Sequence, residues 1–139
     1  MNNNDIVPCF DSDTDEKLFI ALERMEGVDG GLIVGLSGYI DTYNSMHIQQ
    51  RMQKAFDAGF TRLLFDMRAL AYASSTGIYS FICFRNACQR AGGEIALAGM
   101  QDVVAGVFDI LGFMSFFPIF DTVEDARCFL TQGRVAEAS

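Results

Sequence analysis

One stretch near the middle of the chain decides the fold, and it reads Arg62-Leu63-Leu64-Phe65-Asp66-Met67-Arg68-Ala69-Leu70-Ala71-Tyr72-Ala73-Ser74-Ser75-Thr76-Gly77-Ile78. Its beginning, Leu63 to Phe65, is a short apolar run typical of a buried strand, whereas from Ser75 onward the apolar spacing is that of a helix. The residues between them are expected to form a loop. The stretch therefore predicts an interior strand, a loop and a helix that begins at Ser75.

Three hydroxyl residues, Ser74, Ser75 and Thr76, stand at the predicted start of this helix. A side-chain oxygen there can accept a hydrogen bond from the backbone N–H groups of the first turn, which lack acceptors within the helix. A phosphate on one of them would lie beside the same N–H groups and the positive end of the helix dipole. The segment is therefore a candidate helix cap and a candidate phosphorylation site.

The pattern Asp66-Met67-x-x-Leu70-x-Tyr72-x-Ser74-Ser75-Thr76-Gly77-Ile78 resembles the signature of the STAS domain, the fold of bacterial anti-sigma factor antagonists. Supporting resemblances lie on either side of it, and together they cover residues 17–131. In the family an aspartate precedes the phosphorylated serine, and here Ser74 stands in its place. The two flanking segments are Leu36-Ser37-Gly38-Tyr39-Ile40-Asp41 and Gly112-x-x-x-Phe116-x-x-Ile119-Phe120-x-x-x-Glu124-Asp125-Ala126.

The resemblance implies a partner-switching regulator. In such a cycle the unphosphorylated antagonist binds an anti-sigma factor that is a serine kinase, and phosphorylation of the antagonist ends that binding. The expected phosphorylated residue is Ser75, with Ser74 and Thr76 as alternatives. The same resemblance makes three further residues neighbours of the site: Asp41, Asp66 and Gly77. For the two aspartates, a capping or loop-fixing role is the alternative.

Composition favours a protein as the partner. The chain has 139 residues, half of them apolar, which suits one domain with one main core. A formal charge of −8 argues against binding to nucleic acid or to an anionic membrane. No segment reaches the roughly 18 uninterrupted apolar residues of a membrane span, and the N-terminus lacks the charge and apolar run of a signal peptide. A cytoplasmic location is expected, and a homodimer is an open alternative.

The sequence also argues against an enzyme. Ser75 has no histidine in a recognisable partner motif, and no phosphate-cradling glycine motif is present. The four cysteines lack C-x-x-C spacing, so neither a metal site nor a cofactor is expected, and each cysteine is interpreted as a buried small apolar residue in a reducing cytosol. They are Cys9, Cys83, Cys88 and Cys128.

Strands and helices alternate along the rest of the chain. Residues 1–16 are expected to be a flexible lead-in or an edge strand, residues 17–131 the STAS domain, and residues 132–139 a frayed tail. An initial hairpin, Leu18–Met25 with Leu32–Leu36, precedes the alternating part. The prediction is a single α/β domain with a mixed sheet of four to six strands and about four helices that cover mainly one face.

The helix that starts at Ser75 has more apolar residues than one face can hold. Ile78, Tyr79 and Ile82 point away from its main stripe and lie close to the hydroxyl cluster. They are either core residues of a helix buried on two sides or an exposed contact patch for a partner. The predicted partner-binding residues are therefore Ile78, Tyr79 and Ile82. The alternative function is a constitutive STAS scaffold, or a STAS subunit of a regulatory or transport complex, without a phosphorylation switch.

Overall fold

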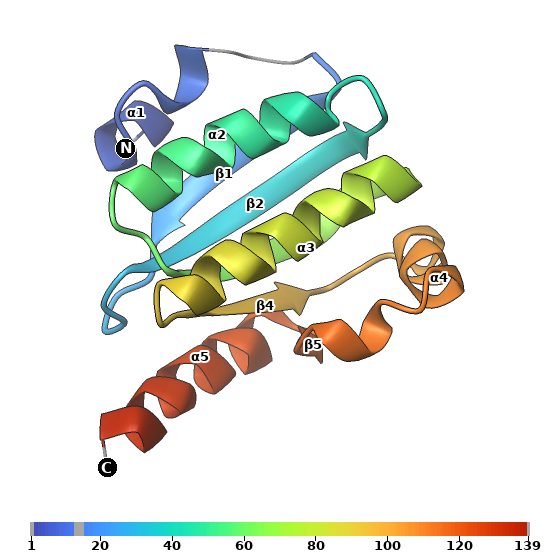
Figure 1. Cartoon of the computed structure of the whole chain (residues 1–139). Coiled ribbons are helices and arrows are strands. Elements are labelled where there is room, and N and C mark those ends of the chain that lie inside the picture. Colours follow the sequence, from blue (N-terminus) through green and yellow to red (C-terminus); the bar gives the residue numbers. More distant parts are fainter. Residues whose placement is uncertain (1, 13–15, 139) are drawn as a thin grey trace.

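The computed structural model describes residues 2–12 and 16–138 (Figure 1). These residues build a five-stranded sheet whose strands lie side by side in chain order. The first two strands are antiparallel and each later strand runs parallel to its neighbour, so the sheet is mixed, as predicted. The strands are β1 (Leu18–Arg24), β2 (Gly31–Ile40), β3 (Arg62–Ala73), β4 (Glu94–Ala98) and β5 (Ile119–Phe120).

Helices cover the two faces of the sheet unequally (Figure 1). The larger hydrophobic core lies under α2 and α3 on one face, and a smaller one lies under α5 on the other. This confirms the predicted α/β domain with helices mainly on one face. The helices are α1 (Asn3–Ile6), α2 (Ser45–Asp57), α3 (Ser75–Arg90), α4 (Asp102–Ile110) and α5 (Val123–Ala138), with short 3₁₀ turns η1 (Phe10–Ser12) and η2 (Met114–Phe116).

β3 is the central strand, as its apolar start predicts. Leu63, Leu64 and Phe65 are fully buried. Because successive side chains of a strand point to opposite faces, Leu63 and Phe65 join the core under α2 and α3, and Leu64 joins the core under α5. Burial of each such side chain contributes roughly 1.5–3 kcal/mol. This run therefore holds both layers to the sheet.

The predicted loop after Phe65 is wrong, because β3 continues to Ala73. Its buried side chains Met67, Leu70 and Ala73 are three residues apart, which is not the two-residue period of a regular strand. The cause is two register shifts against β2, each of which gives β3 one extra residue. Because of these bulges, the buried residues in the second half of β3 do not show the two-residue period from which a strand is predicted.

The first residues form helical turns where a flexible lead-in or an edge strand was expected. Ile6 and Phe10 are buried against the domain. The Asn3 side chain bonds the outer edge of β1, donating to the Ile20 carbonyl and accepting from the Leu22 N–H at 2.8 Å. The segment thereby covers the edge that an added strand would occupy.

A buried cation ties this segment to α2. The Arg51 guanidinium, whose side chain is 4% exposed, forms an ion pair with Asp11 at 2.7 Å. It also lies over the Phe10 ring, 4.7 Å from the ring centre. An unpaired buried charge is costly, and Asp11 of η1 supplies the anionic partner for the buried Arg51 of α2.

Two predictions for the second half of the chain need correction. The sequence pattern predicts for α4 a buried face of Val103, Val107 and Ile110, flanked by Val104 and Leu111. Val104 is buried as expected, together with Phe108, whereas Val103 and Ile110 are 58% and 86% exposed. This helix is apolar on most sides, so spacing alone does not select its buried face. The tail expected over residues 132–139 continues α5 as helix to Ala138, and residue 139 lies outside the described residues.

Candidate functional site

The hydroxyl cluster lies at the start of α3, as predicted, where β2 and β3 also end (Figure 1). Ser74 is the N-cap: its side-chain oxygen accepts from the Gly77 N–H at 3.1 Å, and its own N–H donates to the Ile40 carbonyl at 2.8 Å. One sheet contact and one helix contact thus fix this residue. Ser74 is half-buried and its hydroxyl is engaged as a cap.

Ser75 and Thr76 are the first two residues of α3, and both are exposed. The prediction that Ser75 lies in the first helical turn is confirmed. In that turn the backbone N–H groups have no acceptors within the helix, and the Ser74 hydroxyl accepts only that of Gly77. An anion attached at Ser75 would therefore meet free N–H donors as well as the positive end of the helix dipole.

Gly77 allows α3 to start close to the sheet. A Cβ atom at this position would lie 2.5 Å from Ile40 Cγ2 and 3.3 Å from the Ile40 carbonyl oxygen. Only the absence of a side chain permits this approach. Gly77 is therefore a structural neighbour of the hydroxyl cluster, which sets the position of Ser75 relative to β2.

Asp41 follows β2 directly and fixes the loop beside this cluster. Its carboxylate accepts from the N–H groups of Tyr43 and Asn44, both at 2.9 Å, and pairs with Lys17 Nζ at 3.0 Å. The Asn44 backbone hydrogen bond, then the Lys17 hydrogen bond, lower the pKa of Asp41. The aspartate is thus near the site in a loop-fixing role.

The structure does not bring Asp66 to the cluster. Asp66 lies within β3, level with Gly35 of β2 and Ala98 of β4. Its partner Gly35 stands five residues before Ile40, whose carbonyl accepts from the Ser74 N–H, so roughly 17 Å of sheet separate Asp66 from the cluster. Its carboxylate is bound by Arg68 at 2.8 Å and 2.9 Å, and this hydrogen-bonded guanidinium lowers the pKa of Asp66. Asp66 was expected beside the hydroxyl cluster, and it is not there because β3 continues where a loop was predicted.

The three expected partner-binding residues have different environments. Ile78 is fully buried, so it belongs to the core and cannot be a contact residue. Ile82 is partly buried and packs against the same core. Tyr79 is 53% exposed, and its ring meets that of Phe113 edge-on, with centroids 5.2 Å apart. Tyr79 alone of the three presents most of its side chain to a partner.

The sequence singled out Tyr79 but not the other three exposed tyrosines, which lie near the ends of β2 and β3. The chain has four tyrosines, and all four are at least 41% exposed. Tyr39 and Tyr72 are paired across the ends of β2 and β3, Tyr43 lies in the loop that Asp41 fixes, and Tyr79 lies one turn into α3. The available signal was that none of the four falls on a predicted buried stripe.

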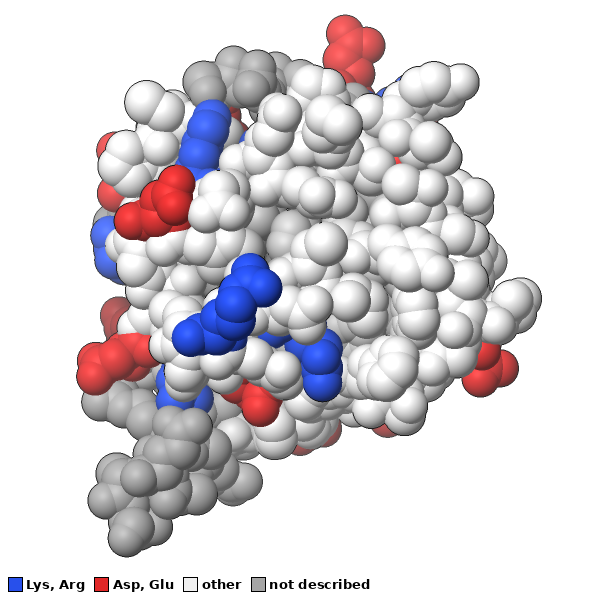
Figure 2. All heavy atoms as spheres, viewed as in Figure 1, with Lys and Arg blue, Asp and Glu red and all other residues white. Residues whose placement is uncertain are grey.

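Other exposed apolar side chains extend this surface. Met46 lies in the first turn of α2, Val103 and Ile110 in α4, and Met114 and Phe116 in η2. Figure 2 shows that the part of the molecule formed by the first half of α3 and by α4 carries few charged side chains. Exposed apolar area marks sites of protein contact where it is contiguous. We call the four tyrosines and these five residues the apolar end.

Within the described residues no group of three or more His, Cys, Asp or Glu side chains gathers as metal ligands. Among the helices of the described chain, none is long and apolar enough to cross a membrane. The prediction that all four cysteines are buried is wrong, because Cys9, Cys83 and Cys128 are exposed. The buried Cys88 thiol lies in the core next to β3, and desolvation raises its pKa to about 12. A thiol with such a pKa is not a nucleophile at neutral pH.

Comparison with known proteins gives the family. The model of the STAS domain matches residues 20–126. BtrV of Bordetella bronchiseptica, which is named as an anti-sigma factor antagonist, is 30% identical over 102 residues, covering 73% of this chain and 88% of BtrV. The chain therefore belongs to the STAS domain family.

Solved structures agree on the fold. The anti-sigma factor antagonist SpoIIAA in its unphosphorylated form superposes with a TM-score of 0.66 at 19% identity, covering 78% of this chain and 92% of SpoIIAA. The phosphorylated form of this Bacillus protein gives 0.60 at 18% identity, with 78% and 96% covered. A sulfate transporter family protein from Wolinella succinogenes gives 0.62 at 19% identity, with 74% and 86% covered.

Proposed function

We propose that this protein is an anti-sigma factor antagonist: it binds an anti-sigma factor with serine-kinase activity through the apolar end, and phosphorylation of Ser75 ends the binding. The observation that carries the proposal is the exposed Ser75 hydroxyl among four exposed tyrosines. Tyrosine is enriched at protein interfaces because it combines large apolar area with a hydrogen-bonding tip. The names of BtrV and SpoIIAA support the same assignment.

Ser75 is a better acceptor than its two neighbours. The Ser74 hydroxyl is half-buried and caps Gly77, so its modification would remove a hydrogen bond of the fold. Thr76 is exposed like Ser75, but the resemblance to the family matches Ser75 to the phosphorylated serine. A kinase would therefore reach Ser75 without disturbing the helix start.

The phosphate would act by charge at the interface. It adds about −1.5 to −2 charges at neutral pH at the exposed start of α3, four residues before the exposed Tyr79. The added anion has donors on its own chain, the free N–H groups at the start of α3, so the domain does not need to refold. A partner surface that packs on the tyrosines would have to desolvate this charge, which weakens binding.

We propose a binding protein that acts in the cytoplasm and is a substrate of a kinase, not a catalyst. The alternative is a STAS scaffold or transport subunit without a switch. The similarity in fold to the Wolinella sulfate transporter family protein is consistent with this alternative. The two functions differ in whether charge at Ser75 matters.

Calorimetry with candidate serine-kinase anti-sigma factors tests the switch. Ser75→Asp should weaken binding on the order of 1–3 kcal/mol, and Ser75→Ala should bind and resist modification. Ser75→Asn is the matched control, since it has the size of aspartate without the charge, and it should bind like the wild type. Mass spectrometry after incubation with kinase and ATP should place the phosphate on Ser75. Equal affinity for all three variants would instead favour a constitutive scaffold.

A further inference from the structure

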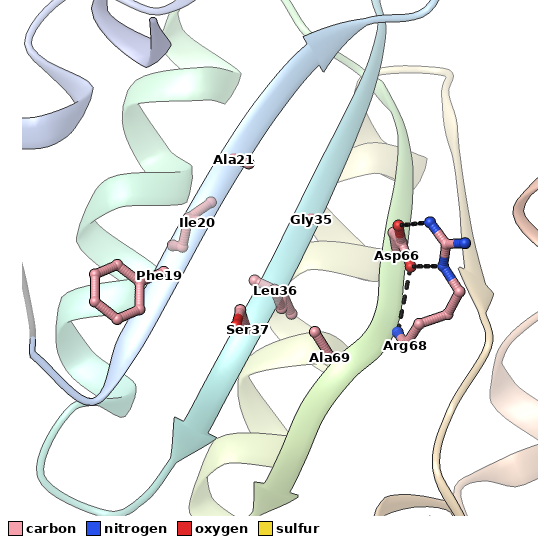
Figure 3. A pocket seen from close by; sticks show the side chains of 9 residues that line it. All are labelled: Phe19, Ile20, Ala21, Gly35, Leu36, Ser37, Asp66, Arg68 and Ala69. Atoms are coloured by element: carbon pink, nitrogen blue, oxygen red, sulfur yellow. Dashed lines mark hydrogen bonds and ion pairs between the residues drawn. The ribbon is translucent and has the colours of Figure 1, made fainter.

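Among the described residues, no helix packs over one part of the sheet. On the face opposite α2 and α3, α5 packs on β3, β4 and β5, which leaves the β1 and β2 half open. The open half holds a hollow of about 430 Å³ (Figure 3). Its floor is made of the small residues Ala21, Gly35 and Ser37.

Two features stand at the rim of this hollow. Phe19 is 67% exposed, and it is the single exposed large apolar side chain of the described residues that lies outside the apolar end. On the other side stands the ion pair of Asp66 and Arg68, drawn in Figure 3, whose side chains are 19% and 68% exposed. A projecting ring, a hollow and two opposite charges thus share one face.

We propose that this face binds a second copy of the chain as a two-fold dimer. In such an interface the same patch meets itself, so every projection needs a complementary hollow within that patch. Phe19 supplies the projection, and the hollow beside it supplies the receptor. Asp66 and Arg68 supply opposite charges that can pair across the interface.

The strand register allows Phe19 to meet the hollow and Arg68 to meet Asp66 in the same dimer. Ala21, Gly35 and Asp66 lie level with one another across three strands. The next row on this face holds Phe19, Ser37 and Ala69. Arg68 lies in the bulge of β3 between the two rows and lines the same hollow. A two-fold axis that crosses the strands midway between the two rows places each Phe19 over Ala21 of the other copy. The same axis brings the long side chain of each Arg68 within reach of Asp66 of the other copy.

Sedimentation equilibrium of the full chain tests the dimer. The wild type should show a monomer–dimer equilibrium, and Phe19→Asp should weaken dimerisation on the order of tenfold or more, because it buries an unpaired charge. Tyr43→Asp is the control: it changes an exposed ring at the apolar end and should leave the dimer intact. A monomeric wild type at millimolar concentration, or a dimer indifferent to Phe19→Asp, overturns the proposal.

Charge reversal gives a sharper test that also controls for folding. Asp66→Arg alone places like charges opposite each other in its own dimer, as does Arg68→Asp, so each variant should be monomeric. An equal mixture of the two restores both pairs across the interface and should form a heterodimer. Failure of the mixture to associate, with both variants folded by circular dichroism, contradicts the geometry. Ser75→Asp should not alter dimerisation, so this test and that of the switch fail independently.

Discussion

The Ser74 hydroxyl accepts a hydrogen bond from the Gly77 backbone N–H at 3.1 Å. This contact divides the roles within the hydroxyl cluster, because the residue that caps α3 is not the residue proposed to carry the phosphate. Loss of a serine cap costs about 0.5–2 kcal/mol. Ser74→Ala should therefore lower the free energy of unfolding by that amount in urea titrations, and it should leave the kinase able to modify Ser75.

The paired variant Ser75→Ala should cost much less stability, since the exposed Ser75 hydroxyl makes no cap. Its effect is expected within about 0.5 kcal/mol, as for surface substitutions generally. If Ser75→Ala proved the more destabilising of the two, the assignment of the cap to Ser74 would be refuted.

A glycine pair tests the close approach of α3 to β2. Gly77→Ala would place a methyl group against Ile40, and such overpacking costs typically about 1–3 kcal/mol. Gly106→Ala is the matched control in the interior of α4, where an added Cβ meets nothing within 4 Å. There the substitution should stabilise the protein by up to about 1 kcal/mol. Thermal unfolding of the two variants should shift in opposite directions.

Two adjacent valines test which face of α4 is buried. Val104 is fully buried and Val103 is 58% exposed. Val104→Ala should lower the free energy of unfolding by about 1–3 kcal/mol through lost burial and a cavity, whereas Val103→Ala should change it by about 0.5 kcal/mol at most. The reverse order in a denaturant titration would restore the stripe predicted from the sequence.

Acid should destabilise the protein through Asp41 and Asp66, whose pKa values are lowered in the folded state. A carboxyl group with a folded pKa below its unfolded value, about 3.9, contributes its full stabilisation above that value. The contribution is lost as the pH falls through the folded pKa. Asp41→Asn should lower stability at pH 7 and flatten its decline below pH 4. If Asp41→Asn lost stability below pH 4 as steeply as the wild type in urea titrations, the Lys17 and backbone contacts of Asp41 would not contribute to stability.

The predictable parts of the fold are those in which one pattern has one structural solution. The run of Leu63, Leu64 and Phe65 suits only a strand buried on both faces, and Ser75 begins a helix after a run of cap residues. The end of β3 was not predictable because two bulges break its period. The buried side of α4 was not predictable because Val103 and Val104 are equally apolar.

The site was predictable only where it depends on local sequence. The placement of Ser75 and Gly77 follows from the start of the helix, and that of Asp41 from the end of β2. Asp66 was misplaced because its distance from Ser75 depends on strand length. Tyr79 was predicted, but Tyr39, Tyr43 and Tyr72 were not, because exposure is a tertiary property, which no spacing within one element reports.

The ion pair between Arg51 and Asp11 limits how far the N-terminus of this protein can be truncated. The family model begins at residue 20, and a domain trimmed to that boundary would leave the Arg51 charge without its carboxylate and without the Phe10 ring. It would also leave the Ile20 carbonyl and the Leu22 N–H of β1 without Asn3. The packed unit of this chain thus extends beyond the matched residues 20–126, and a shortened chain is expected to aggregate through β1 before its partner binding can be measured.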